Sequence, residues 1–213
     1  MTSETNICKR ENTGTGEKRI CAVFIFDGFA DHEVALTMAW LASHGDFAVE
    51  TFSANGHAVT SMSGLKVLPH TTLGKTSPEY FDLLLLPGGE KWEKGDNLEI
   101  FPLIRDTVGK RPIAAICGGT LALGDLGLLN GIPHTSNFPG YIKQFCADYE
   151  GANLYQCAPF VNAEGKIITA NGAGIIDLAY EILKIFGVFD EEKALDWKKL
   201  YQTGGQMQAF FGQ

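Results

Sequence analysis

Cys117 stands between a run of small and apolar residues and two glycines, in the segment 114–120. A buried strand that turns into a helix through one polar residue is typical of a nucleophile elbow, here with Cys where many hydrolases have Ser. Small neighbours let the chain pass close to the turn, and free N–H groups at the start of the following helix stabilise a thiolate. The segment therefore indicates a reactive cysteine, against the alternative of a buried thiol that only packs.

Glu33 is a second candidate, because it follows the first apolar run and lies near the start of a predicted helix. One interpretation is structural: Asp31 caps the helix and Glu33 lies in its first turn, each contributing about 0.5–1 kcal/mol. The other is that Glu33 points at Cys117 and governs its protonation. The spacing does not choose between them for Glu33, whereas capping is the preferred interpretation of Asp31.

Gly88 and Gly89 form a third candidate segment, directly after the apolar run at residues 82–86. Alone, the pair is an ordinary turn. Beside a cysteine elbow it predicts an oxyanion hole built from the N–H groups of Gly89 and Gly118, with Gly88 assigned to the same oxyanion and substrate-binding set.

The elements that must position these segments alternate along the chain. Strands are predicted at residues 20–26, 47–53, 64–68, 82–86 and 112–116, with a hairpin at 160–170. Helices are predicted at residues 31–44, 98–108, 120–129 and 175–186, with a short one after 190. This alternation predicts a mostly parallel sheet with helices on both faces, and ligands gather where such strands end. All three candidate segments lie at such ends.

Composition limits the function classes. The 213 residues are 45% hydrophobic and 20% charged, which fits one globular domain with tails. We expect a flexible tail at 1–18, an α/β domain at 19–190 and a C-terminal helical extension of that domain at 191–213. The net charge of −8 argues against nucleic acid as a partner. No apolar run approaches the roughly 20 residues that span a membrane, and the polar start of the chain lacks the apolar core of a signal peptide.

The cysteines and histidines argue against structural metal or disulfides. Five cysteines occur without any Cys-x-x-Cys pair, and the five histidines show no metal-ligand spacing. A reduced compartment is the simplest interpretation, so we expect a cytoplasmic protein without a bound metal.

Four motifs follow one another along the chain: Gly28-x-x-x-x-Glu33, Leu86-Pro87-Gly88-Gly89, Ala114-Ala115-Ile116-Cys117-x-Gly119 and Gly127-Leu128-Leu129-Asn130-Gly131. In this order they resemble the ThiJ/PfpI family of the class I glutamine amidotransferase-like superfamily, over about residues 20–188. The resemblance implies a flavodoxin-like three-layer α/β sandwich, commonly a homodimer. It also implies a reactive Cys117 whose sulfur is hydrogen-bonded by a protonated Glu33.

The sequence departs from this family where many members carry a histidine near the cysteine, in a Gly-x-x-x-Thr-x-His pattern. Aligning Gly131 and Thr135 puts Asn137 in the histidine position, three residues after His134. Either the strand is bulged and His134 supplies a base, or no Cys–His pair exists. Asn137 in that position is the preferred interpretation, and an amide cannot take a proton.

Family members are described as cysteine peptidases, glyoxalases or deglycases, stress chaperones and isonitrile hydratases. The peptidase branch expects His where this chain has Gly118, and amidotransferases need a late His-x-Glu pair that is missing here. Both activities are therefore disfavoured. Two hypotheses remain. The first is cofactor-free cysteine chemistry on a small carbonyl substrate, and the second is a non-catalytic redox-sensing or stress protein in which Cys117 is oxidised.

Overall fold

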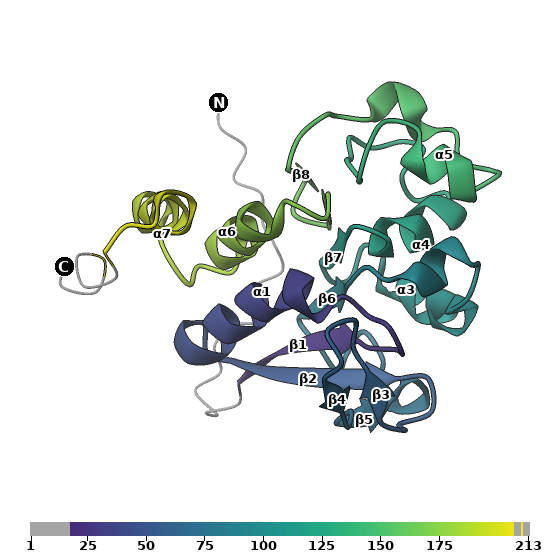
Figure 1. Ribbon diagram of the computed structural model, residues 1–213, viewed down its shortest axis with the longest axis horizontal. Coiled ribbons are helices and arrows are strands. Elements are labelled where there is room, and N and C mark those ends of the chain that lie inside the picture. Colours follow the sequence, from purple (N-terminus) through teal and green to yellow (C-terminus); the bar gives the residue numbers. More distant parts are fainter. Residues whose placement is uncertain (1–17, 207–209, 211–213) are drawn as a thin grey trace.

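The computed structural model describes residues 18–206 and residue 210, so the predicted tail at 1–18 lies almost wholly outside the described residues. Within the described part, seven strands form a central sheet in the order β5-β2-β1-β6-β7-β9-β8 (Figure 1). Every pairing is parallel except that of β8 with β9. The strands are β1 (Arg19–Phe24), β2 (Phe47–Ser53), β5 (Thr71–Thr72), β6 (Leu83–Leu86), β7 (Ile113–Ile116), β8 (Phe160–Ala163) and β9 (Ile167–Ala170). A separate hairpin pairs β3 (Val59–Thr60) with β4 (Lys66–Val67).

Helices cover both faces of the sheet, as the alternating pattern predicts. Figure 1 shows α1 and α6 together on one side of the sheet, with α7 outside α6, and α3 and α4 on the other side. The α-helices are α1 (Asp31–His44), α2 (Glu90–Glu93), α3 (Phe101–Thr107), α4 (Gly119–Asp125), α5 (Tyr141–Phe145), α6 (Ile175–Ile185) and α7 (Glu191–Thr203). Short 3-10 turns are η1 (Leu73–Lys75), η2 (Leu98–Ile100) and η3 (Gly151–Leu154). The predicted three-layer α/β class is confirmed.

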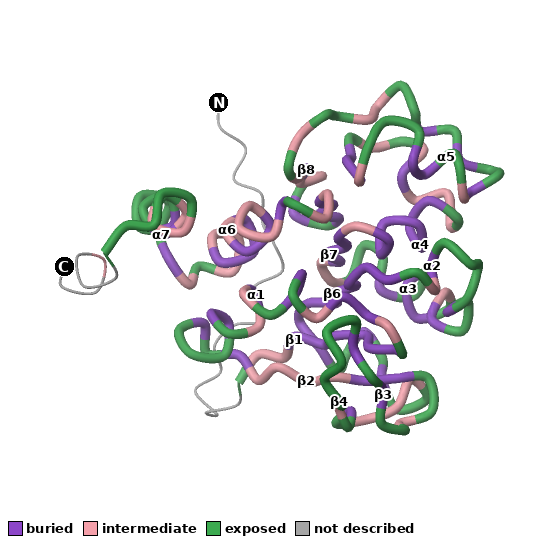
Figure 2. Tube along the Cα trace, viewed as in Figure 1, coloured by how far each residue is buried: buried purple, intermediate pink, exposed green. Residues whose placement is uncertain are grey.

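The core lies along the central strands. All four residues of β6 and all four of β7 are fully buried, which explains why their sequences are continuous apolar runs and do not alternate. Figure 2 shows this burial in the middle of the molecule, with exposed residues along the β3–β4 hairpin and on α7.

Two predicted helices are shorter than expected, for local reasons. The helix predicted at 120–129 ends at Asp125, because the chain turns at Gly127 with a φ of 69°. The helix predicted at 98–108 begins as the 3-10 turn η2, after Asn97 with a φ of 63°. Only its second part, α3, is α-helical.

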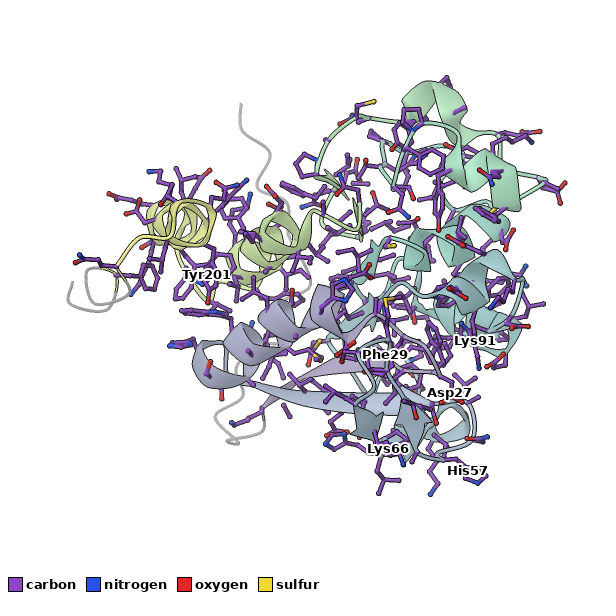
Figure 3. All side chains as sticks on the ribbon, viewed as in Figure 1. Asp27, Phe29, His57, Lys66, Lys91 and Tyr201 are labelled. Carbon is purple, nitrogen blue, oxygen red and sulfur yellow. The ribbon has the colours of Figure 1, made fainter. Side chains whose placement is uncertain are left out.

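The helix predicted after residue 190 is α7, which packs on α6 and on α1. Trp197 is buried, and Nε1 of Trp40 donates to the hydroxyl of Tyr201 at 2.8 Å; Tyr201 is labelled in Figure 3. Among the described residues, no helix is both long and apolar enough to cross a membrane.

Candidate active site

The elbow at Cys117 has the geometry that its sequence predicts. Strand β7 ends at Ile116 and helix α4 begins at Gly119. Between them Cys117 adopts a φ of 55°, a left-handed conformation that costs a non-glycine residue about 1–3 kcal/mol. The turn is held by the N–H of Cys117, which donates to Ala170 O at 3.0 Å, and by the Thr120 hydroxyl, which donates to Cys117 O at 2.6 Å.

The glycines after the cysteine are required by close approach of the backbone. A Cβ on Gly119 would lie 2.4 Å from the carbonyl oxygen of Leu86, and a Cβ on Gly118 would lie 3.1 Å from that of Gly89. The end of β6 therefore passes directly against the elbow, with no room for a side chain between them.

Glu33 lies on the first turn of α1 and points into the site. Its residue is only 3% exposed, and Oε2 accepts the N–H of Gly88 at 2.7 Å. The carboxyl also shares a hydrogen bond with the Cys117 side chain. Of the two interpretations of Glu33, the structure supports the one in which the carboxyl faces the cysteine.

The protonation of the pair differs from the expected thiolate. Burial raises the pKa of Glu33, and burial together with the negative charge of Glu33 raises the pKa of Cys117 to about 11. The N–H of Gly118 and the amide of Asn137 oppose this shift but do not cancel it. Cys117 is therefore a thiol at neutral pH, because desolvation outweighs the helix N-terminus that the sequence analysis relied on.

The loop that leads into α1, and so to Glu33, is fixed by the β3–β4 hairpin. Oδ1 of Asp27 accepts the N–H of Thr60 at 2.8 Å, and the carbonyl of Phe29 accepts the N–H of Met62 at 2.8 Å; Asp27 and Phe29 are labelled in Figure 3. The capping interpretation of Asp31 is wrong: no side chain caps α1, and Asp31 instead accepts hydrogen bonds from the backbone and hydroxyl of Ser63.

Asn137 occupies the position beside the sulfur. Its Nδ2 lies 3.3 Å from Sγ of Cys117, and its Oδ1 accepts the N–H of Gly172 at 3.0 Å. Because a backbone N–H can only donate, Gly172 fixes the orientation of the amide, with the nitrogen toward sulfur. The preferred placement of Asn137 agrees with this geometry.

His134 faces another part of the molecule. It is fully buried, with Nδ1 2.8 Å from Ile132 O and Nε2 2.6 Å from the hydroxyl of Tyr149. Burial lowers its pKa. Both ring nitrogens are thus engaged away from Cys117, so the inclusion of His134 among the catalytic residues is not supported, and His134 and Cys117 do not form a pair.

The N–H groups of Gly88 and Gly118 have different partners. The N–H of Gly118 lies within hydrogen-bond reach of the Cys117 sulfur, and Gly89 packs against Gly118. The assignment of Gly88 to an oxyanion hole is wrong, because its N–H is already donated to Glu33. The oxyanion role of Gly89 and Gly118 stays a prediction.

Gly172 and Tyr141, two residues near the sulfur, were missed by sequence reasoning. Gly172 orients Asn137, while the Tyr141 hydroxyl donates to Oε1 of Glu93 at 2.6 Å and lies close to Asn137 and Cys117. Tyr141 belongs to the segment 130–159, which has no regular hydrophobic period to signal its structure. In the part of the chain that the structure describes, no group of three or more acidic, His or Cys side chains could hold a metal ion.

Comparison with known proteins gives consistent matches. The DJ-1/PfpI family model matches residues 18–185. The "Uncharacterized protease YoaZ" of Bacillus subtilis is 32% identical over 189 residues, 85% of this chain and 90% of its own length. The "Deglycase PH1704" of Pyrococcus horikoshii is 36% identical over 84 residues, 38% of this chain and 50% of its own. The crystal structure of a thiJ/pfpI family protein from Bacillus anthracis superposes with a TM-score of 0.80 at 32% identity, covering 92% of this chain and 93% of that one.

Proposed function

The chain belongs to the DJ-1/PfpI family, and on that premise we propose that it is a cofactor-free, cysteine-dependent enzyme for small electrophilic carbonyl compounds. The substrate class is 2-oxoaldehydes such as methylglyoxal, or their adducts. The observation that carries this proposal is the arrangement at Cys117, where a buried carboxyl and a fixed amide nitrogen both reach one thiol.

The first step is addition of the thiol to the aldehyde. Sγ of Cys117 bonds to the aldehyde carbon, and Glu33 takes the thiol proton as the bond forms. The raised pKa of Glu33 makes it a stronger base than an exposed carboxylate. The negative charge that develops on the substrate oxygen faces the N–H groups of Gly89 and Gly118. Glu33 returns the thiol proton to this oxygen, which completes a hemithioacetal and leaves Glu33 a carboxylate again.

The second step is a proton shift. Glu33 removes the proton on the former aldehyde carbon while the neighbouring ketone oxygen gains a proton, which gives an enediol. The proton then returns to the neighbouring carbon as the first hydroxyl loses its own proton and becomes a carbonyl, so the product is a thioester of a 2-hydroxy acid. Glu33 is the group in contact with the sulfur that can carry this proton. Water then cleaves the thioester, releases the hydroxy acid and restores the thiol.

The last step separates this chain from a hydrolase with a Cys–His pair. Asn137 donates to sulfur but cannot activate water, and His134 is engaged elsewhere. We therefore expect thioester cleavage to be the slow step. The same lack of a histidine beside the sulfur argues against a peptidase, although the relative YoaZ is named an uncharacterized protease.

A redox sensor is the second candidate, favoured by the donors around the sulfur. The Asn137 amide and the Gly118 N–H are placed to bind oxygens added to Sγ. The raised pKa of Cys117 weighs against it, because the thiolate, and not the thiol, is the nucleophile that attacks peroxide. Homodimerisation is a separate proposal, and sedimentation at the mass of a single chain would overturn it.

The experiment that tests the proposed function is methylglyoxal consumption with product identification by NMR. Cys117→Ser should abolish it, and Cys157→Ser, which removes an exposed thiol, should not. A 2-hydroxy acid as product supports the enzyme. No consumption by the wild type, with peroxide adding two oxygens to Cys117 alone, would support the sensor, and casein cleavage lost with Cys117 would support a peptidase.

A further inference from the structure

The side-chain amide of Asn137 has other contacts besides the one with Cys117. Oδ1 accepts the N–H of Gly172 at 3.0 Å, and Nδ2 donates to Sγ at 3.3 Å. The amide nitrogen carries a second hydrogen, and the Tyr141 hydroxyl lies within hydrogen-bond reach of this side chain. The amide is therefore in contact with Tyr141 as well as with Gly172.

Tyr141 is itself anchored. Its residue is 3% exposed, and its hydroxyl hydrogen is donated to Oε1 of Glu93 at 2.6 Å, which leaves the oxygen free to accept from Asn137. Burial and the hydrogen bond to Glu93 raise the pKa of Tyr141, so the hydroxyl stays protonated. Glu93 is the last residue of α2, next to Trp92, whose ring packs against the backbone at Gly118.

We propose that Tyr141, anchored by Glu93, is a positioning residue that keeps the Asn137 N–H directed at the Cys117 sulfur and so favours the thiolate. The proposal rests on the proposed function, in which Cys117 is the nucleophile. It assigns control of this nucleophile to a chain of contacts that runs from an exposed carboxyl on α2 through α5 to the elbow.

The charged and titratable groups around the sulfur distinguish a positioning role of Glu93 from a direct effect of its charge. Glu33 faces it from α1 and Tyr141 from α5, and Glu93 touches Tyr141 from α2. A negative charge on Glu93 acting directly on the sulfur would disfavour the thiolate. Glu93 acting through Tyr141 and Asn137 favours it, so the two roles predict opposite effects when Glu93 is removed.

The test is the rate of alkylation of Cys117 by iodoacetamide as a function of pH, followed by peptide mass, which needs no turnover. We expect Asn137→Ala to slow the reaction at neutral pH about tenfold, the effect of roughly one unit in thiol pKa. Tyr141→Phe, which removes only the hydroxyl, should slow it about threefold and shift the profile to higher pH. The double variant should match Asn137→Ala, because Tyr141 acts through Asn137.

Tyr149→Phe is the matched control, because it removes a hydroxyl that binds His134 and not Asn137. Its alkylation profile should equal that of the wild type. The proposal is overturned if Tyr141→Phe is alkylated at the wild-type rate. It is also overturned if adding Tyr141→Phe to Asn137→Ala slows alkylation as much as Tyr141→Phe slows it in the wild type.

Substitutions of Glu93 give an independent test at an exposed position, which holds even if Tyr141→Phe fails to fold. Glu93→Ala should slow alkylation, and Glu93→Gln, which keeps an acceptor for Tyr141, should restore most of the rate. Faster alkylation in both variants would reveal a simple charge effect and exclude positioning. A wild type that does not consume methylglyoxal would refute the proposed function while leaving these alkylation results to decide the role of Tyr141.

Discussion

The N–H of Gly88 donates to Oε2 of Glu33 at 2.7 Å, and the Cys117 side chain lies directly against this contact. Gly88 and Cys117 follow the ends of β6 and β7, and Glu33 lies on the first turn of α1, which follows β1; these three strands are adjacent in the sheet. Parallel strands bring their carboxyl ends to the same edge, so the sheet itself places a carboxyl beside a thiol. Gly88 is thus a residue that holds the carboxyl in place.

The first prediction follows from the space at Gly88. A Cβ there would lie 2.7 Å from Oε2 of Glu33 and 3.0 Å from Sγ of Cys117, so Gly88→Ala must displace one of them. We expect a loss of about 1–3 kcal/mol in the free energy of unfolding, together with slower methylglyoxal consumption. Urea denaturation and the consumption assay measure the two effects. Gly74→Ala is the control, since a Cβ on Gly74 meets nothing within 4 Å, and equal losses in both variants would contradict this account.

The main elements could be predicted because local signals and tertiary environment agree. The four leucines of β6 form a continuous apolar run, as a strand covered on both faces requires. The bounds of α1 follow from Asp27-Gly28 before it and Gly45 after it. The segment 130–159 could not be predicted, because it contains only the five-residue α5 and the 3-10 turn η3, held by contacts from distant parts of the chain.

The site was predictable in its residue types but not in its protonation. The elbow motif identified Cys117, the family resemblance paired it with Glu33, and the position of Thr135 identified Asn137. The raised pKa of the thiol depends on burial of two titratable groups together, which no local pattern reveals. The contact of Tyr141 with Glu93 joins residues 48 positions apart and has no sequence signal.

The second prediction concerns the pH dependence of stability. The pKa of Glu33 is raised in the folded protein, so folding favours its protonated form and stability is lost as pH rises through the folded pKa. Glu33→Gln removes this loss. Above about pH 4, the free energy of unfolding of the wild type should therefore decrease progressively relative to that of Glu33→Gln. Urea denaturation across a pH series measures this difference.

The control for this prediction is Glu181→Gln. Glu181 is equally buried, at 3% exposure, but its carboxylate pairs with Lys184 at 2.7 Å and accepts from Asn162. Removing that charge should destabilise the protein at neutral pH. Parallel behaviour of the two variants would show that pairing with Lys184 does not distinguish the two carboxyls, and would contradict the prediction.

The third prediction separates His134 from the site. Burial lowers the pKa of His134, so its contribution to stability is present above the ordinary histidine pKa of about 6.5 and is lost as pH falls through the lower folded value. His134→Gln should reduce this acid-induced loss and leave the alkylation of Cys117 unchanged. Slower alkylation, like that expected of Asn137→Ala, would place His134 back in the site.

The last prediction introduces the missing base. If thioester cleavage limits the wild type, methylglyoxal should leave a covalent adduct on Cys117 that is visible by intact mass. Asn137→His puts a proton acceptor where the amide nitrogen lies 3.3 Å from the sulfur. We expect turnover to rise about tenfold. This is less than the roughly hundredfold or larger gain that a well-placed general base contributes. The gain should appear as pH rises through about 6.5, because only neutral imidazole accepts a proton. Asn137→Gln, an amide without this capacity, should show no gain, and equal turnover in the two variants would mean that water attack is not the slow step.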